Sequence, residues 1–233
     1  MAADTFNKHG YYEDLDFMEL HKEILSDHKI NDTGLIPPFN FDLTEYHLEK
    51  LKKNIELKCS LSKQWGWKEP RSCLFIEIYR KLLPQAKYLV VYRDYDFVVD
   101  SLIRRDYIFL TKKYQKLNKA ERIKHEAKVL EGLRIFINVY LSAWTIYNQN
   151  IYNLISALPD DDYIMVQYDK LIKNDKVIFE KLNHWGFKLN YHPFNEIFNP
   201  QLINESPPDI TFNRQLENEA LKVKEQLRPL LNQ

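Results

Sequence analysis

The chain has 233 residues, with 33 basic and 33 acidic side chains, so its formal charge at pH 7 is zero. This balance excludes a cationic field over the whole surface, and we expect no nucleic-acid partner. Hydrophobic residues make up 45% of the chain and aromatic residues 14%, which excludes a disordered protein. The length favours one domain over residues 1–233, with a core over about 8–190 and a C-terminal extension that carries a helix over about 191–233.

Helices and strands are predicted from the spacing of the apolar residues. Helical spacing indicates helices over residues 14–29, 71–83, 94–104, 170–185 and 215–231. Another helix begins at a cap, Asp42 or Thr44, and ends at residue 61. The charged stretch 112–128 leads into a long helix that ends at about residue 157. Short β-rich runs predict strands over residues 65–68, 86–92 and 163–167, and the last two suit strands buried on both faces. Strands that alternate with helices imply an α/β fold, a parallel sheet covered by helices. Three strands are few for such a sheet, so we expect one to be missing.

Glycine is scarce, with five residues at positions 10, 34, 66, 132 and 186. The phosphate-binding loops of dinucleotide-binding and Walker-type proteins need clustered glycines, because the backbone must approach the phosphate closely. Neither loop occurs in this sequence, which disfavours a phosphoryl-transfer kinase. Phosphate chemistry would have to use side chains or helix ends.

The cysteines and histidines show no metal-ligand spacing, so we expect no metal site. Cys59 and Cys73 are expected to be reduced and buried as small apolar residues. We expect no membrane span, because no run reaches the roughly 18 apolar residues of a membrane helix. The first residues do not resemble a signal peptide, and a cytoplasmic location is the expectation.

Ligands of parallel sheets bind outside the carboxyl ends of the strands. Arg93 directly follows the strand 86–92, and Ser101 lies eight positions later on the next helix. A guanidinium and a hydroxyl so placed can converge on one phosphate. The alternative is an ion pair between Arg93 and Asp94 that caps the helix, with Ser101 solvated.

Three segments together carry a family resemblance. Residues 66–105, GWKEPRSCLFIEIYRKLLPQAKYLVVYRDYDFVVDSLIRR, resemble the 3'-phosphoadenylyl sulfate (PAPS)-dependent sulfotransferases, particularly their bacterial branch. That branch has Lys-Asp/Glu-Pro-Arg, an apolar helix, Leu-Pro-x-Ala-Lys, a strand ending in Arg-Asp, and a serine eight positions after the arginine. Residues 163–187, YIMVQYDKLIKNDKVIFEKLNHWGF, are similar to the family's second signature, and residues 9–25 look like the segment that follows its nucleotide loop.

The resemblance implies a P-loop-NTPase-like fold and PAPS as the sulfate donor. By position, Arg93 and Ser101 match the pair that holds the 3'-phosphate, and Tyr168 matches the tyrosine near the adenine. Lys68 matches a basic residue close to the transferring group. Glu13 lies where glycan sulfotransferases of this fold carry the base that deprotonates the acceptor, and capping of the first helix is its alternative.

Other residues near these motifs leave alternatives open. Arg71 either belongs to the nucleotide site or lies on the first turn of its helix. Trp65 and Trp67 are expected in the core, although beside Lys68 they could line an acceptor pocket. The acceptor is not visible in the sequence and could be a glycan, a lipid, a peptide or a small alcohol.

The family's 5'-phosphosulfate loop, an Arg/Lys-Ser-Gly-Thr-type turn between a strand and a helix, has no counterpart in the sequence. We expect this unit, on the order of 30 residues, to have been lost or to lie upstream of the given start. Two hypotheses follow: a sulfotransferase acting on a hydroxyl or amine, or a catalytically degenerate nucleotide-binding or interaction module that keeps only the 3'-phosphate half-site. For the given chain we expect affinity for 3'-phosphoadenosine 5'-phosphate (PAP), weak or no transfer, and self-association through exposed sheet surface.

Overall fold

The computed structural model describes residues 12–196 and 210–232. These residues form two compact units, which divide between Pro84 and Gln85. The protein is α/β and mostly helical, with a small parallel sheet in the second unit. Residues 9–11 of the family-like segment and 197–209 of the expected C-terminal extension lie outside the described residues. That the two units together make one domain stays a prediction.

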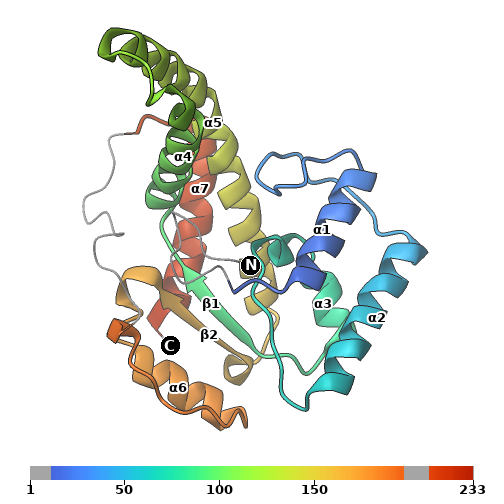
Figure 1. Ribbon diagram of the computed structural model, residues 1–233. Coiled ribbons are helices and arrows are strands. Elements are labelled where there is room, and N and C mark those ends of the chain that lie inside the picture. The colour runs from blue at the N-terminus through green and yellow to red at the C-terminus, as the bar shows by residue number, and fades with distance from the viewer. Residues whose placement is uncertain (1–11, 197–209, 233) are drawn as a thin grey trace. The chain divides into compact units, whose positions relative to one another are not determined.

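The first unit consists of helices joined by loops (Figure 1). These are α1 (Leu15–Asp27), α2 (Glu45–Leu61), the 3₁₀ turn Pro70–Leu74 and α3 (Ile76–Leu82). The hydroxyl of Thr44 accepts a hydrogen bond from the His47 amide at 3.2 Å, so Thr44 and not Asp42 caps α2. The carboxylate of Asp14 caps α1 in the same way.

A buried apolar cluster holds these helices together. Its members come from α1, α2, α3 and the residue just before α3: Phe17, Leu20, Ile24, Leu25, Leu51, Ile55, Phe75 and Tyr79. Trp65 and Trp67 pack against this cluster, and the ring of Trp67 stacks on Phe17 at 4.4 Å. The strand predicted over residues 65–68 is therefore wrong, because packing on α1, and not pairing with another strand, satisfies the alternating pattern.

The two cysteines are free, in agreement with the sequence expectation of reduced thiols. Burial raises the pKa of the Cys73 thiol to about 12, so this thiol stays protonated. Cys59 is exposed, and the expectation that it is buried was wrong.

The second unit alternates strands with helices. It contains β1 (Tyr88–Tyr92), α4 (Tyr95–Thr111), α5 (Lys119–Ile155), β2 (Tyr163–Gln167), α6 (Asp175–His184) and α7 (Arg214–Leu227). The strands β1 and β2 are parallel, in a register that pairs Tyr88 with Tyr163 and Tyr92 with Gln167. Two of the three predicted strands and their parallel arrangement are thus confirmed.

The two strands differ in burial. Four of the five residues of β2 are buried, as expected. In β1, by contrast, Leu89 is 44% exposed and Val91 is 47% exposed, so the prediction of a strand buried on both faces is wrong for β1. The register places Leu89 and Val91 on the same face of the sheet as Ile164 and Val166 of β2. On that face Ile178 of α6 packs against the two β2 residues and leaves the β1 residues uncovered.

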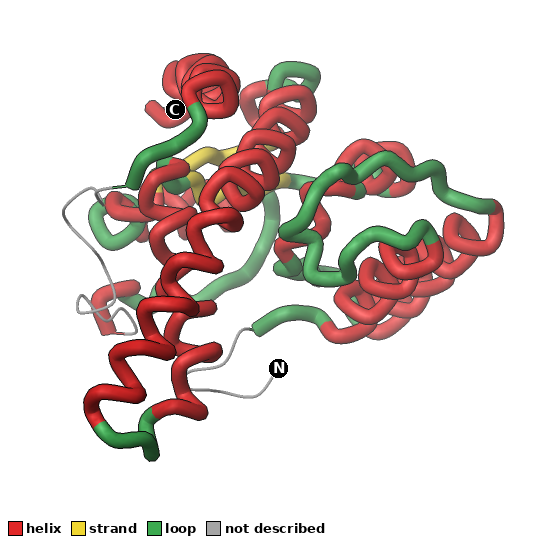
Figure 2. The backbone as a smooth tube through the Cα atoms, turned by 90° about the horizontal axis from the view of Figure 1, so that it is seen from above, coloured by secondary structure: helices red, strands yellow, loops and turns green. Residues whose placement is uncertain are grey.

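The helix α5 packs along both α4 and α7 (Figure 2). By length and composition α5 could cross a membrane, and it alone could do so among the described helices, although a long core helix meets the same criterion. Its buried side chains lie mainly in its C-terminal half: Leu133, Tyr140, Leu141, Ala143, Trp144, Asn148, Leu154 and Ile155. One such helix among the described residues is compatible with the expected lack of a membrane span.

Candidate functional site

Arg93 is held at the carboxyl end of β1 by aromatic neighbours. Its carbonyl oxygen accepts a hydrogen bond from the Trp144 indole at 3.0 Å. Its guanidinium lies 4.9 Å from the ring centroid of Tyr168 and 5.6 Å from that of Phe97. These cation–π contacts orient a half-buried cation without using its N–H donors.

The neighbouring carboxylate of Asp94 is occupied by other partners. It accepts a hydrogen bond from the Tyr92 hydroxyl at 2.7 Å and pairs with Lys224 of α7 at 3.0 Å. Asp94 makes no side-chain cap for α4. Within the described ranges the guanidinium of Arg93 makes no ion pair. The alternative of an Arg93–Asp94 pair capping the helix is therefore wrong.

Ser101 lies on the face of α4 that continues from Arg93. Phe97 and Ser101 are four residues apart and so share one side of the helix. Ser101 is exposed. Its convergence with Arg93 on one phosphate stays a prediction.

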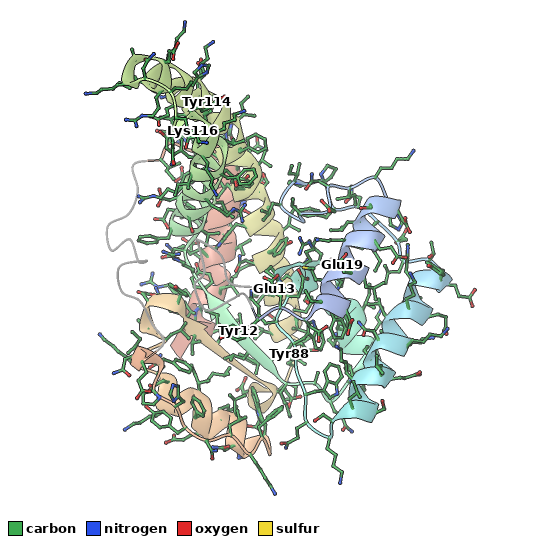
Figure 3. All side chains as sticks on the ribbon, in the orientation of Figure 1. Tyr12, Glu13, Glu19, Tyr88, Tyr114 and Lys116 are labelled. Carbon is green, nitrogen blue, oxygen red and sulfur yellow. The ribbon has the colours of Figure 1, made fainter. Side chains whose placement is uncertain are left out.

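In the first unit, Glu13 and Lys68 form an ion pair. The Lys68 ammonium lies 2.8 Å from Oε1 of Glu13, and the Glu13 side chain is the more buried of the two. Figure 3 shows Glu13 just before α1. Because Asp14 and not Glu13 accepts the amide hydrogen bonds of the first turn, Glu13 is not the cap of α1. The two residues that the resemblance assigns to catalysis are thus in contact.

Arg71 lies in the 3₁₀ turn and is bound within its own unit. It donates to the Glu69 carboxylate and, at 2.7 Å, to the carbonyl oxygen of Asp32. These contacts favour the structural alternative, in which Arg71 fixes the turn, over a role in nucleotide binding.

Glu69 of the Lys-Glu-Pro-Arg motif belongs to a buried network that the sequence did not reveal. The Nδ1–H of His21 donates to Glu69 at 2.6 Å, and the Tyr79 hydroxyl donates to Nε2 of His21 at 2.6 Å. Burial lowers the pKa of His21, so the ring is neutral. Burial by itself would raise the pKa of the Glu69 carboxyl. The contacts with His21 and Arg71 have the larger effect and hold this pKa below its ordinary value. No local pattern links positions 21, 69 and 79.

The predicted site residues thus fall into two sets. Glu13, Lys68 and Arg71 lie in the first unit, whereas Arg93, Ser101 and Tyr168 lie in the second. A joint site that contains both sets stays a prediction. Within residues 12–196 and 210–232, no group of three or more histidine, cysteine or acidic side chains could hold a metal. A shallow depression on α7, beside Arg214 and Lys222, contains none of the predicted site residues.

Comparison of the chain with protein-family models, curated proteins and solved structures found no match. The observations that bear on function are therefore the sequence motifs and the surroundings of Arg93 and Glu13.

Proposed function

We propose that the chain is a sulfotransferase-like protein whose second unit binds the 3'-phosphate of PAPS or PAP through Arg93. In this proposal β1 and β2 are part of a P-loop-NTPase-like sheet, and Tyr168 lies beside the adenine. Ser101 supplies a neutral donor to the same phosphate. The motifs in residues 66–105 and 163–187 support the proposal.

The observation that carries the proposal is the set of contacts made by the Arg93 guanidinium. Its guanidinium rests on the rings of Tyr168 and Phe97 and has no acidic partner in the part of the chain that the structure describes. A positioned guanidinium with unused donors suits a phosphate, because its planar fork matches two phosphate oxygens. An arginine that served only to stabilise the fold would be expected to pair with the adjacent carboxylate, which instead binds Lys224.

For transfer, Glu13 would be the base and Lys68 would stabilise the leaving group. The S–O bond to the donor's 5'-phosphate breaks, and a new bond forms from sulfur to the acceptor atom, S–O for a hydroxyl or S–N for an amine. The acceptor proton goes to Glu13. Lys68 contacts Oε1 of Glu13, and Oε2 makes no hydrogen bond or ion pair with the described residues, so it can accept a proton. The positive charge of Lys68 would offset the charge that develops on the PAP product.

Titration calorimetry with two nucleotides tests the phosphate site. PAP and adenosine 5'-monophosphate differ only in the 3'-phosphate, so we expect PAP to bind at least roughly tenfold more tightly. Arg93→Ala should abolish this preference, whereas Arg104→Ala, which removes an exposed arginine paired with Asp100 on the same helix, should keep it. Equal affinities for the two nucleotides, or no binding of PAP at about millimolar concentration, would contradict the proposal.

The second candidate is a nucleotide-binding or interaction module without turnover, favoured by the absence of a glycine-containing phosphosulfate loop from the sequence. A transfer assay with PAPS and a panel of glycan, lipid, peptide and small alcohol acceptors separates the two. Turnover that Glu13→Gln abolishes while PAP affinity is unchanged would establish the enzyme. PAP binding without turnover would establish the module.

A further inference from the structure

The end of the α4–α5 hairpin exposes large apolar side chains. We call residues 108–130 the hairpin tip: the last turn of α4, the 3₁₀ turn Lys112–Tyr114, the connecting loop and the first turns of α5. Within the second unit the tip extends beyond the β1–β2 sheet (Figure 1), and Figure 3 labels Tyr114 and Lys116 at its end. Phe109 is 72% exposed and Ile123 is 53% exposed, and Ile108, Leu110, Leu117 and Leu130 are exposed as well.

The same tip concentrates positive charge in a chain whose charges balance. Residues 112–128 contain seven lysines and arginines but only two glutamates. Both glutamates are engaged locally, since Glu121 accepts from the Asn118 side chain at 2.8 Å and Glu126 pairs with Arg122 at 3.6 Å. The six lysines make no ion pair with the residues that the structure describes: Lys112, Lys113, Lys116, Lys119, Lys124 and Lys128.

Apolar and basic side chains form adjoining rows on α5. Ile123, Ala127 and Leu130 are spaced by four and three residues, so they share one exposed face. The next residue along the chain from each forms a second row, which contains Lys124 and Lys128 and ends at Glu131, just beyond the tip. On the inner side, the rings of Tyr114 and His125 stack at 4.5 Å and fix the turn between the helices.

We propose that the hairpin tip binds an anionic lipid surface, with its lysines at the headgroups and Phe109, Ile108 and Ile123 in the outer acyl region. Basic amphipathic helices bind membrane interfaces through the same combination of charge attraction and apolar burial. Nucleic acid fits less well, because a strand of bases needs exposed stacking surfaces. Tyr114 and His125 already stack on each other, and most of the exposed side chains are aliphatic. This binding is independent of the nucleotide site.

Vesicle co-sedimentation of the full chain tests the proposal. Vesicles of phosphatidylcholine with about 30 mol% phosphatidylserine should bind the protein at least roughly tenfold more tightly than pure phosphatidylcholine vesicles, and about 0.5 M NaCl should reduce the difference. The triple variant Lys112→Glu, Lys113→Glu, Lys116→Glu should lose this binding. The matched control Lys63→Glu, Lys81→Glu, Lys222→Glu changes the net charge equally at exposed lysines elsewhere and should bind like the parent chain.

A further pair of variants examines the apolar contribution. Phe109→Ser with Ile123→Ser leaves the tip charge unchanged and should weaken binding to the anionic vesicles several-fold, because it removes acyl-chain contacts. Equal circular dichroism of all variants would show that the fold persists. The proposal is overturned if the anionic vesicles bind no protein, if the tip and control charge variants behave alike, or if the serine variant binds undiminished. Tip-dependent binding of an oligonucleotide without binding of vesicles would also overturn it and assign the tip to nucleic acid.

Discussion

The ammonium of Lys224 lies 3.0 Å from the carboxylate of Asp94, the residue that directly follows Arg93. Lys224 belongs to α7, near the C-terminal end of the chain, whereas Asp94 precedes α4. This pair occupies the carboxylate that would otherwise be the nearest partner of the Arg93 guanidinium. The availability of Arg93 for an anion therefore depends on a residue far away in the sequence.

Lys224→Met is expected to weaken PAP binding although Lys224 is not assigned to the nucleotide. Without the lysine, Asp94 can attract Arg93 and compete with the phosphate, which we expect to cost about 1 kcal/mol, or roughly fivefold in affinity. The control Lys222→Met changes an exposed lysine on the same helix. Titration calorimetry should show the loss for Lys224→Met alone, and an equal affinity of both variants would show that Asp94 does not compete.

Tyr168 is expected to act through the face of its ring. Tyr168→Phe keeps a ring under the guanidinium and should bind PAP nearly as well as the parent chain. Tyr168→Leu removes the cation–π contact and should cost about 0.5–2 kcal/mol. Calorimetric affinities for the two variants check this order. If Tyr168→Phe lost as much as Tyr168→Leu, the hydroxyl and not the ring would hold the ligand.

The contact between Arg93 and Tyr168 could be anticipated from the sequence because it follows from parallel strands. Arg93 comes directly after β1 and Tyr168 directly after β2, and the register pairs the last residues of these strands, Tyr92 and Gln167. Strands that end together bring the residues after them together. The apolar runs that predict the two strands therefore also indicate that Arg93 and Tyr168 lie close together.

Other features depend on packing that no local pattern encodes. The alternation at Trp65 and Trp67 is typical of a strand, yet stacking of Trp67 on Phe17 of α1 accounts for it. The Lys224–Asp94 pair depends on how α7 docks, and the His21–Glu69 hydrogen bond joins residues 48 positions apart. Tertiary contacts of this kind override local preference.

The first unit is expected to lose stability in mild acid. Burial lowers the pKa of His21 below the ordinary value of 6.5, so the unfolded chain takes up this proton more readily than the folded chain. The contribution of neutral His21 to the free energy of unfolding is complete above pH 6.5, and it is lost as the pH falls through the lower pKa that His21 has in the folded state. Glu69, whose pKa also lies below its ordinary value in the folded state, adds a loss in the same direction at lower pH, beginning near 4.5.

Hydrogen exchange of the α1 and α3 amides between pH 7.5 and 5, corrected for the intrinsic pH dependence of exchange, measures this effect. His21→Leu should remove most of the dependence above pH 5 and lower the free energy of unfolding by about 2 kcal/mol, because it leaves one oxygen of the buried Glu69 carboxylate without its donor. His184→Leu, at an exposed histidine, serves as the control. A parent chain whose first unit is equally protected at both pH values would refute the link to His21.

Self-association through the open face of β1 is the remaining expectation. Leu89 and Val91 are exposed on the face where α6 covers only β2, and β1 pairs with no other strand in the described sheet. Unpaired strand edges beside apolar surface favour pairing with a second chain. Sedimentation at increasing concentration should show an oligomer, and Leu89→Lys with Val91→Lys should shift it to monomer. Leu57→Lys with Leu61→Lys adds the same charge at exposed leucines of α2 and should leave the oligomer intact. A parent chain that is monomeric at high concentration would refute the expectation.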